Sequence, residues 1–313
     1  MTLFSKIPRT YAEQLQLLRT RGLEITDEAF ALHCLQHPNY YRLSAYRFTF
    51  LEAGSKEDFR RGTRFTDLWT LYDFDQTIRR LVLDASKRVE VSVRSRWAYF
   101  LAHRYGAFAY ADAAHFQSAN AHQRMLDKLD EELARSTEEF VGHFSRQHGL
   151  VRPPIWAACE VLSFGLMSRF YGTLRRSRDR LEIARTYGVD DKVLASFLHH
   201  LATVRNHAAH HGRVWNRSFT VAMAPPRFPK SLAASFVDNK ETAERRLYNT
   251  LTMLIYLLSI IEPGCPIPRF LHQSLSEADP SYHHHMGFPA DWKSRALWRA
   301  AAEGPSQSGQ NPA

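Results

Sequence analysis

Apolar side chains recur at spacings of three and four residues along most of the chain, which is the period of a helix with one buried face. The longest such pattern begins at Thr66 and holds until Gly106, so it predicts one amphipathic helix well beyond the usual three or four turns. Its apolar positions are Leu68, Leu71, Phe74, Ile78, Leu81, Ala85, Val89, Val93, Trp97 and Phe100. We expect this helix to be a spine on which the others pack.

Shorter helices are predicted before and after the spine. Before the spine, the pattern predicts one helix over 10–22 and a second that starts at Thr26, with Asp27 and Glu28 in its first turn. After the spine, it predicts helices over 123–147, from Ile155 onward, over 191–211 and over 242–262. Residues 214–238 fit no element, and no alternation of apolar and polar residues is strong enough for a sheet. The chain is therefore predicted to be all-α, a helical bundle built on the long spine helix with an N-terminal helical extension.

Four segments are expected along the chain. Residues 1–62 form the N-terminal extension, 63–265 the bundle, and 266–302 a C-terminal helical element packed on the bundle. Residues 303–313 are rich in Gly, Ser, Gln and Pro and are predicted to be a flexible tail.

The charge balance points to an anionic partner. The 313 residues include 41 Lys and Arg against 32 Asp and Glu, a net charge of +9, which favours nucleic acid or an anionic membrane surface over a merely solvated basic face. Arg side chains offer the planar fork that suits phosphate. The most apolar stretch, 251–261, is about half of what a membrane-spanning helix needs, and no signal peptide is visible. We expect a cytoplasmic protein that does not contact membranes.

Neither cysteines nor consecutive histidines predict a metal site or a cofactor. Cys34, Cys159 and Cys265 are far apart and odd in number, so reduced core thiols are expected rather than a disulfide framework or a zinc ribbon. The run from Tyr282 to His285 has three adjacent histidines, which do not easily converge on one ion, and we expect a surface loop there.

The candidate chemistry lies in the seven residues from Arg205 to His211, with the sequence RNHAAHH. Cleaving RNA requires a base for the 2′-hydroxyl, an acid for the leaving oxygen, and stabilisation of the charge on the phosphorus centre. A histidine can carry either proton at neutral pH, and an arginine can hold the phosphate oxygens. An asparagine can orient the imidazole or the phosphate, and none of these steps requires a metal.

Two arrangements of this segment are open from the sequence. If the helix continues, Asn206, His210 and Arg213 fall at i, i+4 and i+7 and line one face. If Gly212 ends it, the histidines lie at the negative end of the helix dipole, which favours their protonated form. In either case one chain supplies few such groups, and two copies facing each other would make a more complete site. An arginine and a histidine at this spacing also occur by chance at a helix end with surface histidines.

A second cluster, 39–47, combines aromatic and basic residues without helical periodicity. It could stack bases and grip phosphates, but an aromatic plug that packs the N-terminal helices onto the spine is the favoured interpretation.

Short stretches in order along most of the chain carry a resemblance to one family. They are Tyr11–Leu15, Leu17–Leu23, Asn39–Ser44, Gly62-Thr63 with Phe65, Leu71-Tyr72 with Phe74-Asp75, Pro154–Trp156, Glu160, Ser163–Gly165, Arg205–His211, Arg213–Arg217, and Met286–Pro289 with Asp291-Trp292. In these positions the chain resembles the Abi-like, or abortive-infection, family of bacterial proteins within the wider HEPN group of ribonucleases.

The resemblance implies a HEPN-type bundle, a role in phage defence or as a toxin, and RNA as substrate or regulator. The family's R-x-x-x-x-H residues correspond to Arg205 and His210, with Asn206 as their polar neighbour, and these three are the expected catalytic residues. His207 departs from the small or apolar residue expected there. A homodimer and an antitoxin RNA or protein are the further partners expected. Arg213, Arg217 and Arg42 are expected to position RNA. The alternative is a non-catalytic RNA-binding defence protein that senses, or is regulated by, a structured RNA.

Overall fold

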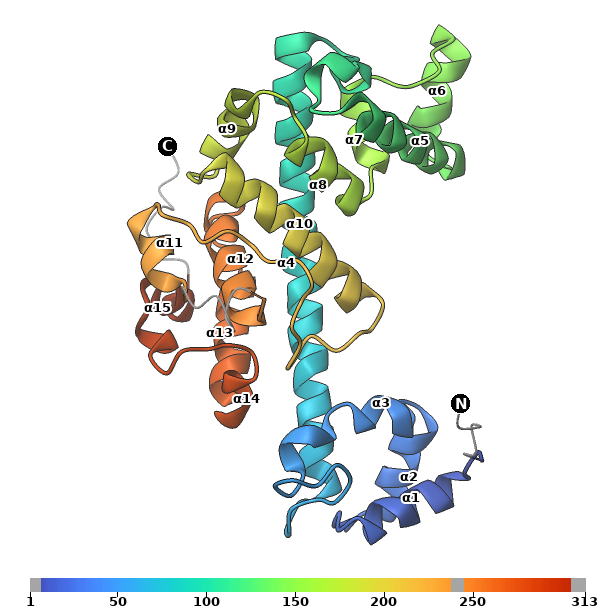
Figure 1. Ribbon diagram of the computed structural model, residues 1–313, viewed down its shortest axis with the longest axis vertical. Helices are drawn as coiled ribbons and strands as arrows, with labels where there is room; N and C mark the ends of the chain where they lie inside the picture. The colour runs from blue at the N-terminus through green and yellow to red at the C-terminus, as the bar shows by residue number, and fades with distance from the viewer. Residues whose placement is uncertain (1–6, 238–244, 305–313) are drawn as a thin grey trace, which may run out of the picture. The chain divides into compact units, whose positions relative to one another are not determined.

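The computed structural model describes residues 7–237 and 245–304 (Figure 1). Within these ranges it contains fifteen α-helices, four short 3-10 helices and three isolated β-bridges, with no strand. The prediction of an all-α fold on one long helix is therefore confirmed. Contacts divide the chain into two compact units, Met1–Thr77 and Ile78–Ala313, and the division falls inside the long helix. The segment boundaries expected at 62, 265 and 302 stay predictions.

The first unit holds the three N-terminal helices and the start of the fourth. In order its elements are α1 (Tyr11–Thr20), α2 (Glu28–Gln36), α3 (Tyr40–Ser44), η1 (Arg47–Phe50) and the first turns of α4 (Phe65–Tyr105).

The second unit holds the rest of α4 and every later element. These are η2 (Ala109–Ala111), η3 (Ala113–His115), α5 (Ala119–Arg135), α6 (Glu139–His148), α7 (Ile155–Val161), α8 (Phe164–Gly172), α9 (Ser177–Arg185), α10 (Asp191–Ala209), α11 (Lys230–Ser235), α12 (Leu247–Ile261), α13 (Ile267–Glu277), α14 (Ser281–His284), η4 (Trp292–Ser294) and α15 (Ala296–Glu303).

Helix α4 is the predicted spine. It has 41 residues, which at 1.5 Å per residue gives a length of about 60 Å. Its apolar stripe is buried, and Ile78, Val89 and Trp97 have no exposed surface. The helix begins at Phe65 rather than after Thr66 as predicted, because the Asp67 carboxylate accepts the backbone N–H of Arg64 at 2.8 Å and closes the first turn there.

In the first unit, local capping decides where the helices begin. Thr10 and Glu13 form a reciprocal capping box at α1, and Gly22 follows the helix with a positive φ of 86°. Helix α2 is capped by Asp27, whose carboxylate accepts the N–H of Phe30 at 2.9 Å, so the helix begins at Glu28, two residues after the start predicted at Thr26.

The aromatic cluster at 39–47 divides into a buried and an exposed part. The Tyr46 ring is buried, and its hydroxyl donates to the Asp75 carboxylate at 2.6 Å, so this residue acts as the predicted plug. Tyr41, by contrast, is 86 % exposed. The plug prediction therefore holds for Tyr46 only.

The structure corrects the prediction at two places in the second unit and leaves a third outside the described residues. The helix expected over 123–147 is two helices, α5 and α6, because the Ser136 backbone is extended and its hydroxyl accepts the N–H of Glu138, a turn that competes with the helix. The unassigned segment 214–238 contains α11. Helix α12 begins at Leu247, and the start expected at Thr242 lies outside the described residues, as does most of the predicted tail.

Helix α12 runs through the core of the second unit. Twelve consecutive residues, from Leu247 to Leu258, are buried, including polar Asn249, Thr250 and Thr252. Helix α8 packs on α10, and α15 packs on α11, α12 and α13. The three cysteines are buried and free, as predicted, and burial raises the pKa of the Cys34 thiol to about 11. In the part of the chain that the structure describes, no helix is both long and apolar enough to cross a bilayer.

His200 is the most enclosed histidine of α10. It has no exposed surface, and its Nδ1 lies 2.6 Å from the carbonyl of Val221 while its Nε2 lies 2.7 Å from the Thr250 hydroxyl. A neutral ring satisfies both contacts, with Nδ1–H donating and Nε2 accepting. Burial lowers the pKa of this histidine from 6.5 to about 4.

The chain is therefore expected to lose stability in mildly acidic solution through His200. Between pH 6.5 and 4 the unfolded state binds a proton that the folded state excludes, so the free energy of unfolding falls as pH falls through this window and this contribution is constant above it. The full loss is about 3 kcal/mol. His200→Gln keeps a donor and an acceptor but does not titrate, so its unfolding free energy, measured by urea denaturation from pH 7 to 4, should fall less steeply. Parallel curves for the two proteins would contradict this assignment.

Candidate functional site

The Arg205–His211 segment spans the C-terminal end of α10. The last helical residue is Ala209, and His210 is the cap. His211 takes a left-handed conformation with φ of 57°, its N–H donates to the Ala208 carbonyl at 3.1 Å, and the Gly212 N–H donates to the His207 carbonyl at 2.7 Å. This double closure is a Schellman motif, in which a glycine usually occupies the left-handed position.

The helix end settles the choice left open by the sequence. The helix does not continue, so Arg213 does not share a helical face with Asn206 and His210. The left-handed residue is His211 and not the glycine that follows. Gly212 is required for a different reason, since a Cβ at this position would lie 3.0 Å from the His207 carbonyl oxygen.

The Arg205 guanidinium contacts the side chains of Asn206 and Glu90. Its Nη1 donates to the Asn206 Oδ1 at 3.1 Å, and its Nη2 lies 3.6 Å from Oε2 of Glu90 on α4. The other Glu90 oxygen binds Arg94 at 2.5 Å, and the Glu90 side chain is only 8 % exposed while that of Arg205 is 37 % exposed. The guanidinium is thus oriented by a buried carboxylate and still reaches solvent. Asn206, which accepts the hydrogen bond from Arg205, and His210 are both exposed.

The other end of the segment is also fixed by α4. Arg79 is buried, and its Nη1 donates to the backbone carbonyl of His211 at 2.8 Å. One helix therefore holds both ends of the candidate motif, through Glu90 and through Arg79.

Sequence reasoning did not identify Glu90 or Arg79. The sequence of the spine does contain a pattern that could have identified them. Its buried polar residues recur at spacings of four, seven and four, at Asp75, Arg79, Ser86 and Glu90. Such a stripe within a long core helix indicates partners on other elements, because an unpaired buried charge is costly.

His207 differs from the two histidines that follow it. Its ring is partly buried and packs 6.0 Å from the Phe219 ring, centroid to centroid. Burial, together with the positive charges of Arg217 and His210, lowers its pKa below the ordinary value, so the ring is neutral at pH 7. His207 therefore packs the connection after α10, while His210 and His211 are exposed.

The Arg213–Arg217 stretch is built into the second unit through Trp215. This side chain has no exposed surface, and its Nε1 donates to the Tyr282 carbonyl at 3.2 Å. The Arg213 guanidinium lies 5.8 Å from the Trp215 ring centroid, and Arg246 donates to Asn216 Oδ1 at 2.9 Å. The stretch therefore anchors the chain that leaves the Arg205–His211 segment.

A model of the family described as Abi-like protein matches residues 33–216, more than half of the chain. The chain belongs to the Abi-like protein family. The matched region contains all of α4 and α10 and ends at Asn216, so Glu90, Arg79 and the whole Arg205–His211 segment of this Abi-like protein lie inside it. The curated proteins and the solved structures yielded no match.

The histidines near the C-terminus do not form the surface loop that was expected. They belong to the one-turn helix α14 and its cap, where Tyr282 is buried and His283 Nε2 lies 2.8 Å from the Leu275 carbonyl. The His285 ring lies 5.2 Å from that of Trp215, and burial lowers its pKa. These contacts give His283 and His285 packing roles, while His284 is exposed. Within 7–237 and 245–304 no three His, Cys, Asp or Glu residues converge in a metal-binding arrangement.

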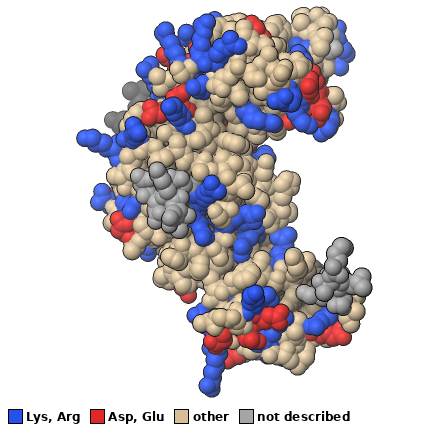
Figure 2. Space-filling model, viewed as in Figure 1, with Lys and Arg blue, Asp and Glu red and all other residues tan. Residues whose placement is uncertain are grey.

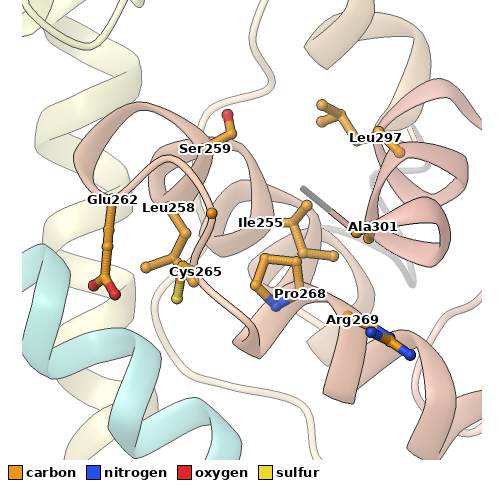
Figure 3. Close-up of a pocket in the computed structure, with 12 residues that line it drawn as sticks. Ile255, Leu258, Ser259, Glu262, Cys265, Pro268, Arg269, Leu297 and Ala301 are labelled. Atoms are coloured by element: carbon orange, nitrogen blue, oxygen red, sulfur yellow. The ribbon is translucent and has the colours of Figure 1, made fainter. Parts of the chain in front are cut away.

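The second unit has a basic surface and an apolar pocket, which we compare with the position of the candidate site. On the face shown in Figure 2, Lys and Arg side chains gather over the part of the second unit where α10 ends, with few acidic side chains between them. Figure 3 shows an apolar pocket of about 210 Å³ between α12, α13 and α15, where Ile255, Leu258 and Leu297 point into it. None of the predicted site residues lines this pocket.

Arg42 belongs to α3 of the first unit, so its part in RNA binding stays a prediction.

Two neighbouring substitutions should change stability in opposite directions. His211 has a left-handed backbone, which costs a residue with a Cβ about 1 kcal/mol but costs glycine little. His211→Gly should therefore raise the free energy of unfolding by up to about 1 kcal/mol. Gly212→Ala places a Cβ against the His207 carbonyl and should lower it by about 1–2 kcal/mol. Chemical denaturation of both variants beside the wild type measures this, and equal effects of the same sign would contradict the motif.

Proposed function

We propose that this Abi-like protein is a metal-independent endoribonuclease of the HEPN type, acting as a toxin in abortive-infection defence against phage. The observation that carries the proposal is the end of α10. There Arg205, tethered to Glu90 and Asn206, lies four residues before the last residue of the helix whose exposed cap is His210. A cation, an amide and an imidazole thus reach solvent within six consecutive residues.

These groups match the needs of RNA cleavage by the neighbouring 2′-hydroxyl. The 2′ oxygen attacks the phosphorus as the bond to the 5′ oxygen breaks, which leaves a 2′,3′-cyclic phosphate and a 5′-hydroxyl. His210 removes the 2′ proton or donates one to the leaving oxygen. Arg205 binds the phosphate oxygens as charge develops on them, and Asn206 orients the phosphate or the imidazole.

A second copy of the chain would complete the site. Each chain offers two adjacent exposed imidazoles at the end of α10, of which only His210 belongs to the R-x-x-x-x-H pair, and the reaction needs both a base and an acid. In a homodimer with the two α10 ends facing each other, one His210 takes the first role and its counterpart the second. Arg213 and Arg217 follow the cap directly and would hold the flanking phosphates, with Arg42 as a further contact.

One feature favours a second candidate, a non-catalytic protein that binds a structured RNA as sensor or regulator. The buried Glu90 carboxylate, 3.6 Å from Arg205, compensates part of its charge and so weakens its stabilisation of charge that develops in a reaction. This candidate predicts salt-dependent RNA binding without cleavage.

Purified protein should cleave RNA in the presence of a chelator and leave 2′,3′-cyclic phosphate ends. His210→Ala should lower the cleavage rate by about 10²–10⁴-fold, through the loss of proton transfer. Arg205→Ala should lower it by about 10²–10³-fold, through the loss of charge stabilisation. Denaturing gels and end-group analysis measure both.

Two matched variants serve as controls for this assay. His199→Ala removes an exposed histidine from the same helix, and Arg178→Ala removes an arginine whose side chain is 75 % exposed on α9. Both should cleave RNA at the wild-type rate. Cleavage that survives His210→Ala and Arg205→Ala would overturn the assigned roles, and RNA binding without any cleavage would support the second candidate.

In growing bacteria, induced expression of the wild type should arrest growth, and His210→Ala should not at equal protein level. The reason is that an active ribonuclease depletes cellular RNA whereas a binding protein retains its effect without the imidazole. Culture density and immunoblots of soluble protein measure this, and equal toxicity of the two proteins counts against the enzyme.

A further inference from the structure

A pocket in the first unit combines features that the catalytic proposal does not use. It has a volume of about 580 Å³, within the range of small-molecule sites. Within 7–237 and 245–304, all the residues that line it lie between Ile7 and Glu57, in the first unit. Its polar lining comprises Arg9, Gln14, Arg21, Tyr40, Tyr41, Ser44, Arg47 and Glu57.

The charge of this pocket is positive. Of its three arginines, Arg21 already has partners in the protein: it forms a salt bridge with Glu57 at 2.7 Å and donates to the Tyr40 hydroxyl at 2.6 Å. Arg9 and Arg47 form no salt bridge within 4.0 Å that the described residues show, and Arg9 interacts electrostatically with Glu13, which does not line the pocket. The lining thus carries two cations in excess of its one carboxylate, which suits an anionic group such as phosphate.

Two buried polar atoms in the lining lack protein partners. The Gln14 amide donates through Nε2 to the Arg9 carbonyl at 3.0 Å, and its Oε1 is a buried acceptor with no donor in the described part of the chain. The Arg47 Nε–H is a buried donor without an acceptor among the described residues. Buried polar groups are nearly always satisfied, so an unpaired acceptor and an unpaired donor in one pocket indicate a ligand that supplies both.

The rim supplies an aromatic surface. Tyr41 is 86 % exposed although it stands in a short helix whose neighbour Leu43 is buried. An exposed ring beside arginines is the arrangement that stacks a base while its phosphate is held.

We propose that this pocket binds a nucleotide unit, either a free mononucleotide or one residue of single-stranded RNA. Arg47 and Arg9 hold the phosphate, Tyr41 stacks on the base, and the Gln14 carbonyl accepts a hydrogen bond from a base amino group or a sugar hydroxyl. The pocket is a second nucleotide site, separate in sequence and in unit from the Arg205–His210 segment. It does not depend on whether that segment is catalytic.

The test uses the full-length protein and a fluorescent ten-nucleotide RNA with 2′-O-methyl groups, which cannot be cleaved by 2′-oxygen attack. Arg47→Ala and Tyr41→Ala should each weaken binding roughly tenfold by fluorescence anisotropy, and Tyr41→Phe should bind like the wild type. Arg61→Ala, an exposed arginine of the same unit that does not line the pocket, is the matched control and should change binding little. Ultraviolet crosslinking should attach the probe to the peptide containing Tyr41.

Competition distinguishes the sources of the ligand. Displacement of the probe by adenosine monophosphate, uridine monophosphate or unlabelled oligonucleotide, with weaker displacement by inorganic phosphate, supports a nucleotide site. Preference for mononucleotides assigns it to a free nucleotide, and preference for the oligonucleotide assigns it to RNA. Equal displacement by phosphate or by a polyglutamate peptide, or equal losses for Arg47→Ala and Arg61→Ala, would overturn the proposal. Because the probe is not a substrate, these outcomes are independent of the cleavage assay.

Discussion

The carboxylate of Glu90 is the group on which the arrangement of the candidate site depends. It is buried in the middle of α4 and binds two arginines, Arg94 on its own helix and Arg205 on α10. A buried carboxylate without cations would be costly, so the packing of α10 on the spine and the position of Arg205 are coupled in one interaction. Arg79 adds a second tie at the far side of the helix end. The candidate catalytic residues are therefore placed by the spine and not by their own loop.

This coupling also orients the arginine of the candidate pair. The Arg205 guanidinium lies against a buried anion, and His210 stands at a cap whose backbone is closed by two hydrogen bonds. Trp215, five residues after His210, is buried in the core. The chain is therefore anchored before His210 by Arg205 and after it by Trp215. Fixed geometry of this kind is what a site for phosphate chemistry requires.

The elements that the sequence predicted correctly are those governed by local physics. The apolar stripe of α4 and the capping box of α1 are visible in the residues themselves. Where two local signals compete, the boundaries shift, as at Thr26 and Asp27 or at Ser136. The partners of Glu90 and Arg79 were not predicted, because the pattern of one helix shows that a buried charge needs a counterpart but not which distant residue supplies it. Likewise the sequence showed the cluster at 39–47 but not that Tyr46 enters the core while Tyr41 stays in solvent.

The direction of α10 has a consequence for any anionic ligand at its end. Sites that hold phosphate on a helix generally use the N-terminus, where free N–H groups and the dipole attract negative charge. Here the segment lies at the opposite end, whose carbonyls repel an anion, although the hydrogen bond from Arg79 and those of the Schellman motif cover part of that polarity. A phosphate can approach only if side chains reverse the local potential. The arginines around the cap are therefore an electrostatic requirement of this topology, whichever reaction or binding event they serve.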